Sequence, residues 1–341
     1  MTRSLRIAAV GDKLGLARAE YVAADLRRLH PDVPTEILLA GERPGSSPTA
    51  GASGPTRPDR DVDERDTAGV EAVRRLLLDE RADVAVSAMR DVPLGSAEGI
   101  RLAAVPMRAD PRDALISSTD KVLSYLPPGT RVGTADPSRR AQLLRRRSDL
   151  DVYPIRGSVE ERLKRLDHDD LDAIVVSAEN LARLGLLDYV TEYFDTDQLI
   201  PAPGQATLAV EVRDGDEEAR RLVARLNDEP TEYATTAERT CVSRLRPDPG
   251  AAIGAFALTD GEIMFIHGIV ASEDGSQAAR LRWTGPWREA VDVGETLAEL
   301  LLSAGGREIL AGEPIETIDF AKLHRQRIEE DWDRPYPPEE A

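Results

Sequence analysis

A carboxylate beside an arginine is the pair of residues in this chain best suited to chemistry. Asp91 follows Arg90 shortly after a short apolar run, and Pro93 comes two residues later. In a cleft that excludes water, such a carboxylate stabilises positive charge that develops during a reaction. The same position also suits an aspartate that accepts hydrogen bonds from the backbone of a turn. The residues alone leave both interpretations open.

Sulfur and imidazole chemistry has little support in the sequence. The single cysteine, Cys241, falls within an apparent helix, where a lone cysteine is usually a small buried apolar residue. One cysteine excludes an intramolecular disulfide, and the four scattered histidines lack the spacing of metal ligands. We therefore expect no metal site.

The composition indicates an acidic globular protein. Its 341 residues suffice for two or three domains with cores, and no apolar run is long enough to span a membrane. We expect no signal peptide, because Arg3 and Arg6 flank only a short apolar strand. The formal net charge of −18 disfavours binding to nucleic acid or to an anionic membrane. We expect a cytoplasmic protein with a small-molecule partner, and no nucleic-acid or membrane partner.

Strands and helices alternate along most of the chain, as in α/β folds with largely parallel sheets. The predicted strands are 5–10, 35–40, 82–86, 131–134, 152–155, 173–177 and 207–212. The predicted helices are 14–29, 68–79, 138–147, 159–166, 179–184 and 217–226. From about Thr231 the pattern changes to a helix, three strands (252–258, 263–271 and 278–283) and a helix at 293–303, which indicates a small α+β domain.

Two segments lack the apolar residues that a packed core requires. Segment 41–66 is rich in Gly, Pro, Ser, Thr and Asp, and segment 326–341 is acidic and rich in Pro. We expect a flexible loop or a lid at 41–66 and a solvated acidic tail at 326–341.

Six stretches resemble, in order, the motifs of one enzyme family. They are LRIAAVGDKLGLARAEYV, RADVAVSAMRDVP, DPRDALIS, RVGTADPSRRAQL, PIRGSVEERLKRLD and LIPAPGQATLAVEVR. The family is porphobilinogen deaminase, also called hydroxymethylbilane synthase. The resemblance implies an α/β protein with two periplasmic-binding-protein-like domains joined by two crossovers, plus a small α+β C-terminal domain. The implied boundaries are 1–108 with 206–228 for the first domain, 109–205 for the second and 229–325 for the third.

The resemblance also implies roles for charged residues. Asp91 matches the family's catalytic aspartate, which stabilises the cationic azafulvene that forms when ammonia leaves. Family arginines that hold the acetate and propionate groups of pyrroles have matches here, and arginine suits this task because it pairs bidentately with carboxylates. The expected substrate-binding residues are Lys13, Arg90, Arg139, Arg156 and Arg162. For Arg139, at a helix start, solvated surface charge is the alternative interpretation.

One position departs from the family in a way that bears on the reaction. Pro249 stands where the family carries the cysteine that attaches a dipyrromethane cofactor by a thioether, and proline has no nucleophilic side chain. Other expected cofactor contacts also differ, among them Asp12, Ala135 and Asp136. We therefore expect that the protein has no dipyrromethane cofactor.

Three functional hypotheses follow. The favoured one is a specialised enzyme of this family that activates an aminomethylpyrrole or a similar small amine by Asp91-assisted loss of ammonia, without a covalent primer. An alternative is a non-catalytic binding or regulatory protein that holds a small carboxylate in its cleft. Genuine hydroxymethylbilane synthesis, a transferase reaction of tetrapyrrole metabolism, is the other alternative. We expect a monomer.

Overall fold

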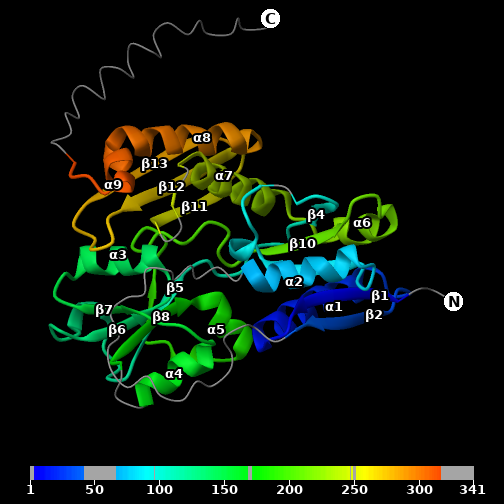
Figure 1. Ribbon diagram of the computed structural model, residues 1–341, viewed down its shortest axis with the longest axis horizontal. Helices are drawn as coiled ribbons and strands as arrows, with labels where there is room; N and C mark the ends of the chain where they lie inside the picture. Colours follow the sequence, from blue (N-terminus) through cyan, green and yellow to red (C-terminus); the bar gives the residue numbers. More distant parts are fainter. Residues whose placement is uncertain are drawn as a thin grey trace, which may run out of the picture.

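The computed structural model describes residues 4–41, 67–95, 97–167, 171–245, 247–248 and 251–315. Within these ranges the chain forms three sheets with helices packed against them (Figure 1). Three features expected from the sequence fall at positions that are not described: all but the first residue of the loop 41–66, the acidic tail 326–341, and Pro249.

The first sheet is mixed and carries helices on both faces. Its strand order is β2-β1-β3-β10-β4. The strands are β1 (Leu5–Val10), β2 (Thr35–Ala40), β3 (Val84–Ala88), β4 (Ile100–Ala104) and β10 (Leu208–Arg213), and the helices are α1 (Lys13–Leu29), α2 (Thr67–Leu78) and α6 (Glu217–Val223). Alternate side chains of β1 point to opposite faces, so Ile7 packs in the α1 core while Ala8 packs in the α2 core.

The second sheet repeats this arrangement. Its order is β7-β6-β8-β5-β9. The strands are β5 (Asp113–Ser117), β6 (Arg131–Thr134), β7 (Asp151–Pro154), β8 (Ala173–Ser177) and β9 (Glu192–Phe194), and the helices are α3 (Pro137–Arg146), α4 (Val159–Asp167) and α5 (Ala178–Leu184). Every residue of β8 is buried, as expected for a central strand covered on both faces.

Two crossovers link these sheets, and they account for a difference from the sequence prediction. The chain passes from β4 to β5 and returns from β9 to β10. Two of the four strand pairings in each sheet are antiparallel, because β5 and β10 enter their sheets after a crossover. The expectation of largely parallel sheets is therefore wrong for half of the pairings. The predicted fold class is confirmed, whereas the exact domain boundaries stay a prediction.

The third sheet is antiparallel and follows the order β11-β12-β13. Its elements are α7 (Glu229–Leu245), β11 (Ala252–Asp260), β12 (Ile263–Ala271), β13 (Ala278–Pro286), α8 (Ala290–Leu301) and α9 (Arg307–Ala311). Helices α7 and α8 pack on one face, and part of the other face packs on Ala141 of α3. Short helical segments complete the description: η1 (Met89–Asp91), η2 (Leu123–Tyr125), η3 (Leu187–Tyr189), η4 (Ala224–Leu226), η5 (Trp287–Glu289) and η6 (Leu302–Gly306).

Each sheet with its helices forms one of three units, and a buried carboxylate joins the two crossovers to the third unit. Glu238 of α7 is fully buried. Its oxygens accept hydrogen bonds from Nη1 and Nη2 of Arg108 at 2.8 and 2.9 Å, from the backbone N–H of Gly204 at 2.8 Å and from that of Ala257 at 2.7 Å. Arg108 belongs to the first crossover and Gly204 to the second. The three units are therefore connected by one ion pair, Arg108 with Glu238, which we call the joint at Glu238.

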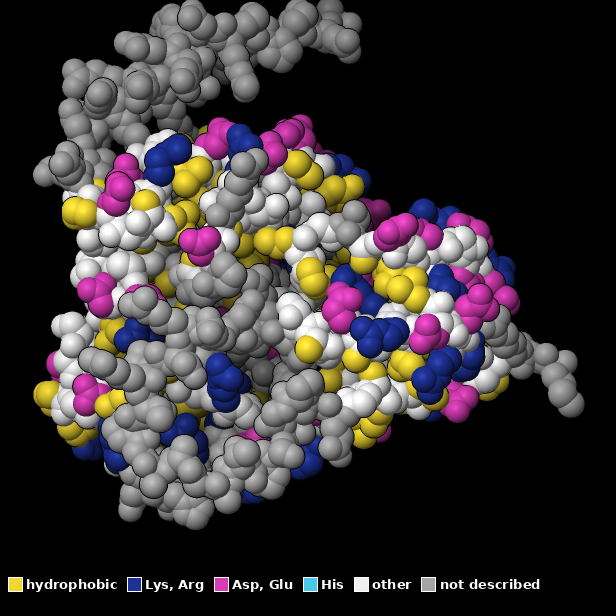
Figure 2. All heavy atoms as spheres, viewed as in Figure 1, with side chains coloured by type: hydrophobic (Ala, Val, Ile, Leu, Met, Phe, Trp, Pro, Cys, Tyr) yellow, Lys and Arg dark blue, Asp and Glu magenta, His cyan; other side chains and the backbone are white. Residues whose placement is uncertain are grey.

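The surface mixes charges of both signs. Figure 2 shows basic and acidic side chains interspersed over the lobe that carries α6, on the right of the view. Among the residues that the structure describes, no helix combines the length and apolar composition that crossing a membrane requires.

Candidate functional site

Asp91 lies on a tight turn at the carboxyl end of β3. The turn is the short helix η1, in which the N–H of Val92 donates to the carbonyl of Met89 at 3.2 Å. Arg239 of α7 donates to the carbonyl oxygens of Met89, Val92 and Pro93 at 3.2, 2.9 and 2.7 Å. The Asp91 side chain is 14 % exposed, and its Oδ1 lies 3.9 Å from Nε of Arg90. Arg239 of the third unit thus holds the turn, and the Asp91 carboxylate is partly open to solvent.

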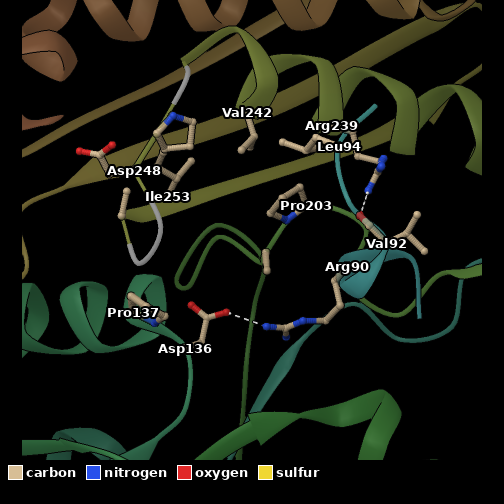
Figure 3. A pocket seen from close by; sticks show the side chains of 13 residues that line it. Arg90, Val92, Leu94, Asp136, Pro137, Pro203, Arg239, Val242, Asp248 and Ile253 are labelled. Carbon is tan, nitrogen blue, oxygen red and sulfur yellow. Dashed lines mark hydrogen bonds and ion pairs between the residues drawn. The ribbon is translucent and has the colours of Figure 1, made fainter. Parts of the chain in front are cut away.

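A pocket beside this turn lies where the three units meet. Figure 3 shows Arg90 extending from the η1 turn toward Asp136, at the start of α3. Nη2 of Arg90 donates to Oδ2 of Asp136 at 3.1 Å, and Oδ1 of Asp136 accepts from the backbone N–H of Arg139 at 3.1 Å. Asp136 therefore caps the N-terminus of α3 with one oxygen and binds Arg90 with the other. Other residues that line the pocket are Val92, Pro203, Arg239, Val242, Asp248 and Ile253.

Arg139 lies in the first turn of α3, and its side chain pairs with two other side chains of the protein. The residue is 3 % exposed. Its Nη2 donates to Oε1 of Gln205 at 2.9 Å, and its Nε lies 3.0 Å from Oδ2 of Asp113 in an ion pair. That contact is not aligned as a hydrogen bond. The sequence predicts a ligand-binding arginine here, and the structure places an internally paired one.

The other three predicted cations gather near the first turn of α4. Arg156 is exposed just after β7, and Nε of Arg162 donates to the carbonyl of Gly157 at 3.0 Å. Lys13 begins α1 and pairs with Glu160 of α4 at 2.9 Å, which raises the pKa of Lys13. The structure thus divides the predicted set into a group around Asp136 and a group around α4.

Sequence analysis missed a buried ion pair that links α1 to α5. Nη2 of Arg18 lies 3.2 Å from Oε2 of Glu179 and donates to Oδ1 of Asn180 at 2.9 Å. Burial opposes the charge on Arg18, but Glu179 and Asp91 raise its pKa above the usual value. A signal was present, because Arg18 falls three residues after Gly15 and four before Val22, on the buried stripe of α1.

The charged site residues share a position in the topology. Asp12 follows β1, Asp91 follows β3, Asp136 follows β6 and Glu179 follows β8. The carboxyl ends of these four internal strands carry residues that are far apart in sequence toward the contact between the first two sheets. There Arg90 binds Asp136, and Arg18 binds Glu179.

Cys241 is buried in the core of the third unit, as the sequence predicts. Burial raises its pKa to about 12, with a smaller contribution from Glu238. The thiolate, which is the nucleophilic form, is therefore scarce at neutral pH. Among the described residues, no cluster of three or more His, Cys, Asp or Glu could hold a metal ion.

We expect Cys241 to resist thiol reagents in the folded protein. Reaction with 5,5′-dithiobis(2-nitrobenzoate) at pH 8, followed by absorbance, should be at least about 100-fold slower in buffer than in 6 M guanidinium chloride, because the thiol is inaccessible and protonated. One thiol per chain should react in the denaturant. Equal rates in both conditions would contradict the buried position.

Comparison with known proteins now identifies the family. The sequence profile described as "Porphobilinogen deaminase, dipyromethane cofactor binding domain" matches residues 5–221. The chain is 36 % identical over 311 residues to the porphobilinogen deaminase of Syntrophotalea carbinolica, which covers 90 % of this chain and 95 % of the relative. The chain belongs to the porphobilinogen deaminase family. The porphobilinogen deaminase of Pelobacter propionicus is also 36 % identical, over 90 % of this chain and 96 % of its own.

Solved structures of other proteins resemble this one only weakly. The substrate-binding domain of a molybdenum ABC transporter from Clostridium difficile gives a TM-score of 0.38 at 15 % identity, covering 66 % of this chain and 93 % of its own. A TRAP periplasmic solute-binding protein from Desulfovibrio salexigens gives 0.39 at 12 % identity, covering 72 % and 78 %.

Membership in the porphobilinogen deaminase family confirms one expectation and corrects another. The predicted enzyme class, a deaminase and transferase of this family, is confirmed. The expectation of no dipyrromethane cofactor is wrong, because the profile that matches residues 5–221 is that of the dipyrromethane-binding domain. The reason is that Pro249 bears only on the covalent attachment of such a group. The domain described as binding it spans residues 5–221 and does not include position 249.

Covalent attachment through sulfur does not fit the described residues. A thioether requires an accessible thiolate. Cys241 is the only cysteine of the chain, and it is buried with a raised pKa.

Proposed function

We propose that the protein is a porphobilinogen deaminase that joins porphobilinogen units with loss of ammonia. The observation that carries this proposal is the position of Asp91. Its partly buried carboxylate lies on a turn clamped by Arg239, beside a pocket where all three units meet. A fixed and partly buried carboxylate suits the stabilisation of a developing cation.

The proposed reaction needs one carboxylate and no redox partner. The bond between the aminomethyl carbon and the protonated amine breaks, and its electron pair leaves with ammonia. The pyrrole nitrogen supplies electrons to the ring, which becomes an azafulvenium cation. Asp91 accepts a hydrogen bond from the pyrrole N–H and stabilises this cation. The α-carbon of a second pyrrole then forms the new carbon–carbon bond, and that carbon releases its proton to water.

The cations divide this work unequally in the proposal. Arg156 is exposed, and with Arg162 and Lys13 it forms the group near α4 that we assign to the substrate carboxylates. Arg90 is 15 % exposed and lies next to Asp91, so we assign it to the acid group nearest the reacting carbon. Arg139 is held by Asp113 and Gln205 and acts as a positioning residue for the start of α3.

Incubation of the purified protein with porphobilinogen tests the proposal. We expect release of one ammonia for each carbon–carbon bond or hydroxymethyl end formed, with linear pyrrole products in the mass spectrum. The intact mass of the denatured protein, taken in parallel, reports any pyrrole units attached covalently. Consumption no faster than in a protein-free control would refute the assignment.

A further inference from the structure

Two arginines converge on one buried glutamate where the first two units meet. Helices α1 and α5 contact each other at this place (Figure 1). Nε and Nη2 of Arg18 lie 3.5 and 3.2 Å from the two oxygens of Glu179, and Nε of Arg183 donates to Oε1 of the same carboxylate. Arg183 also lies over the ring of Tyr21, with Cζ 5.0 Å from the ring centroid.

The glutamate is charged despite its burial. Glu179 is 4 % exposed, and both arginine side chains are 13 % exposed. Burial alone favours the neutral acid, but Arg18 and Arg183 hold the pKa of Glu179 below its usual value. Asp91 is among the charges that act on Arg18, so this cluster lies within electrostatic reach of the candidate catalytic carboxylate.

The geometry matches the way in which arginines hold a carboxylate ligand. Two parallel contacts from one guanidinium, with a second guanidinium on the same oxygen, form a strong anion site. Here the anion is a side chain of the protein. Glu179 therefore occupies the position between the two guanidinium groups that a ligand carboxylate would take.

We propose that Glu179 is a specificity-determining residue that keeps ligand carboxylates from binding between Arg18 and Arg183, where α1 contacts α5. This inference rests on the proposed function, since it concerns how the same cleft selects pyrroles. It predicts that the substrate presents its acid groups only to the cations around Arg90 and α4. Removal of the Glu179 charge would open an additional carboxylate site beside Asp91.

Two opposing variants test the role of Glu179. The probes are pyrrole-3,4-dicarboxylate and its neutral analogue pyrrole-3,4-dicarboxamide, neither of which carries an amine that can leave. Titration calorimetry should show the Kd for the dicarboxylate falling about tenfold in Glu179→Gln, which removes the competing carboxylate, and not falling in Arg18→Gln, which leaves Glu179 in place. The Kd for the diamide should change by less than about threefold in both.

Asp172→Asn is the matched control. Asp172 pairs with Arg131 at 2.9 Å and precedes β8, whereas Glu179 follows that strand. This control should leave both Kd values unchanged. Dicarboxylate binding that is no tighter in Glu179→Gln, or equal shifts for both probes, would show that the pair only clamps the helices. Because binding is measured without turnover, a failure of this inference is distinct from a failure of porphobilinogen consumption.

Discussion

Asp91→Asn should lower the rate of ammonia release from porphobilinogen by about 10²- to 10³-fold, the usual loss when a preorganised electrostatic group is removed. The amide keeps the size of the side chain but not the negative charge that stabilises the azafulvenium cation. Because porphobilinogen itself carries no positive charge on its ring, KM should change by less than about threefold. Steady-state ammonia release at several porphobilinogen concentrations separates kcat from KM.

Asp172→Asn serves again as the control, since its ion pair lies at the other end of β8 from the site. It should retain the full rate. A loss smaller than about tenfold in Asp91→Asn would remove Asp91 from the reaction. A rise in KM at constant kcat would instead assign Asp91 to ground-state binding.

Glu238→Ala should lower the free energy of unfolding by about 3–5 kcal/mol. The substitution leaves the guanidinium of Arg108, whose side chain is 11 % exposed, without its carboxylate, and it also removes the acceptor for the N–H groups of Gly204 and Ala257. An uncompensated buried charge and unsatisfied donors are among the costliest single-residue changes. Urea unfolding followed by circular dichroism measures the effect.

The surface pair between Arg244 and Glu299 provides the comparison. It also has one partner on α7, here the arginine, but its side chains are 47 % and 60 % exposed, at a distance of 3.0 Å. Glu299→Ala should therefore cost less than about 1 kcal/mol. If Glu238→Ala cost no more than Glu299→Ala, the joint at Glu238 would have no role in holding the units together.

Much of the fold could be predicted from the periodicity of the sequence. The predicted strands at 5–10, 35–40, 131–134 and 173–177 coincide with β1, β2, β6 and β8, because these are short segments rich in apolar or β-branched residues between clear breaks. The strands β4, β5 and β9 were not predicted. Strands β4 and β9 lie at sheet edges, where a strand is short and half exposed and gives a weak pattern, whereas β5 is a buried internal strand of five residues.

The site could be predicted only in part. Asp91 and Arg90 stand next to each other in one motif, so their proximity is local and readable. The partners Asp136 and Glu179 come from the other lobe, and no periodicity reports a contact over that separation. The departure from the family at Asp136 was visible, but its consequence, an ion pair with Arg90, required the structure. The cofactor expectation gave too much weight to Pro249 alone.

The placement of Asp12, Asp91, Asp136 and Glu179 after four strand ends separates the molecule's architecture from its chemistry. The strands and the helices behind them form the main apolar cores, whereas Asp12, Asp91, Asp136 and Glu179 belong to none of these cores. Evolution can therefore revise ligand preference at these positions while the sheets remain intact. Such modularity explains how a chain retains more than a third of its relatives' residues, yet supplies from within several of the charges that meet in its cleft.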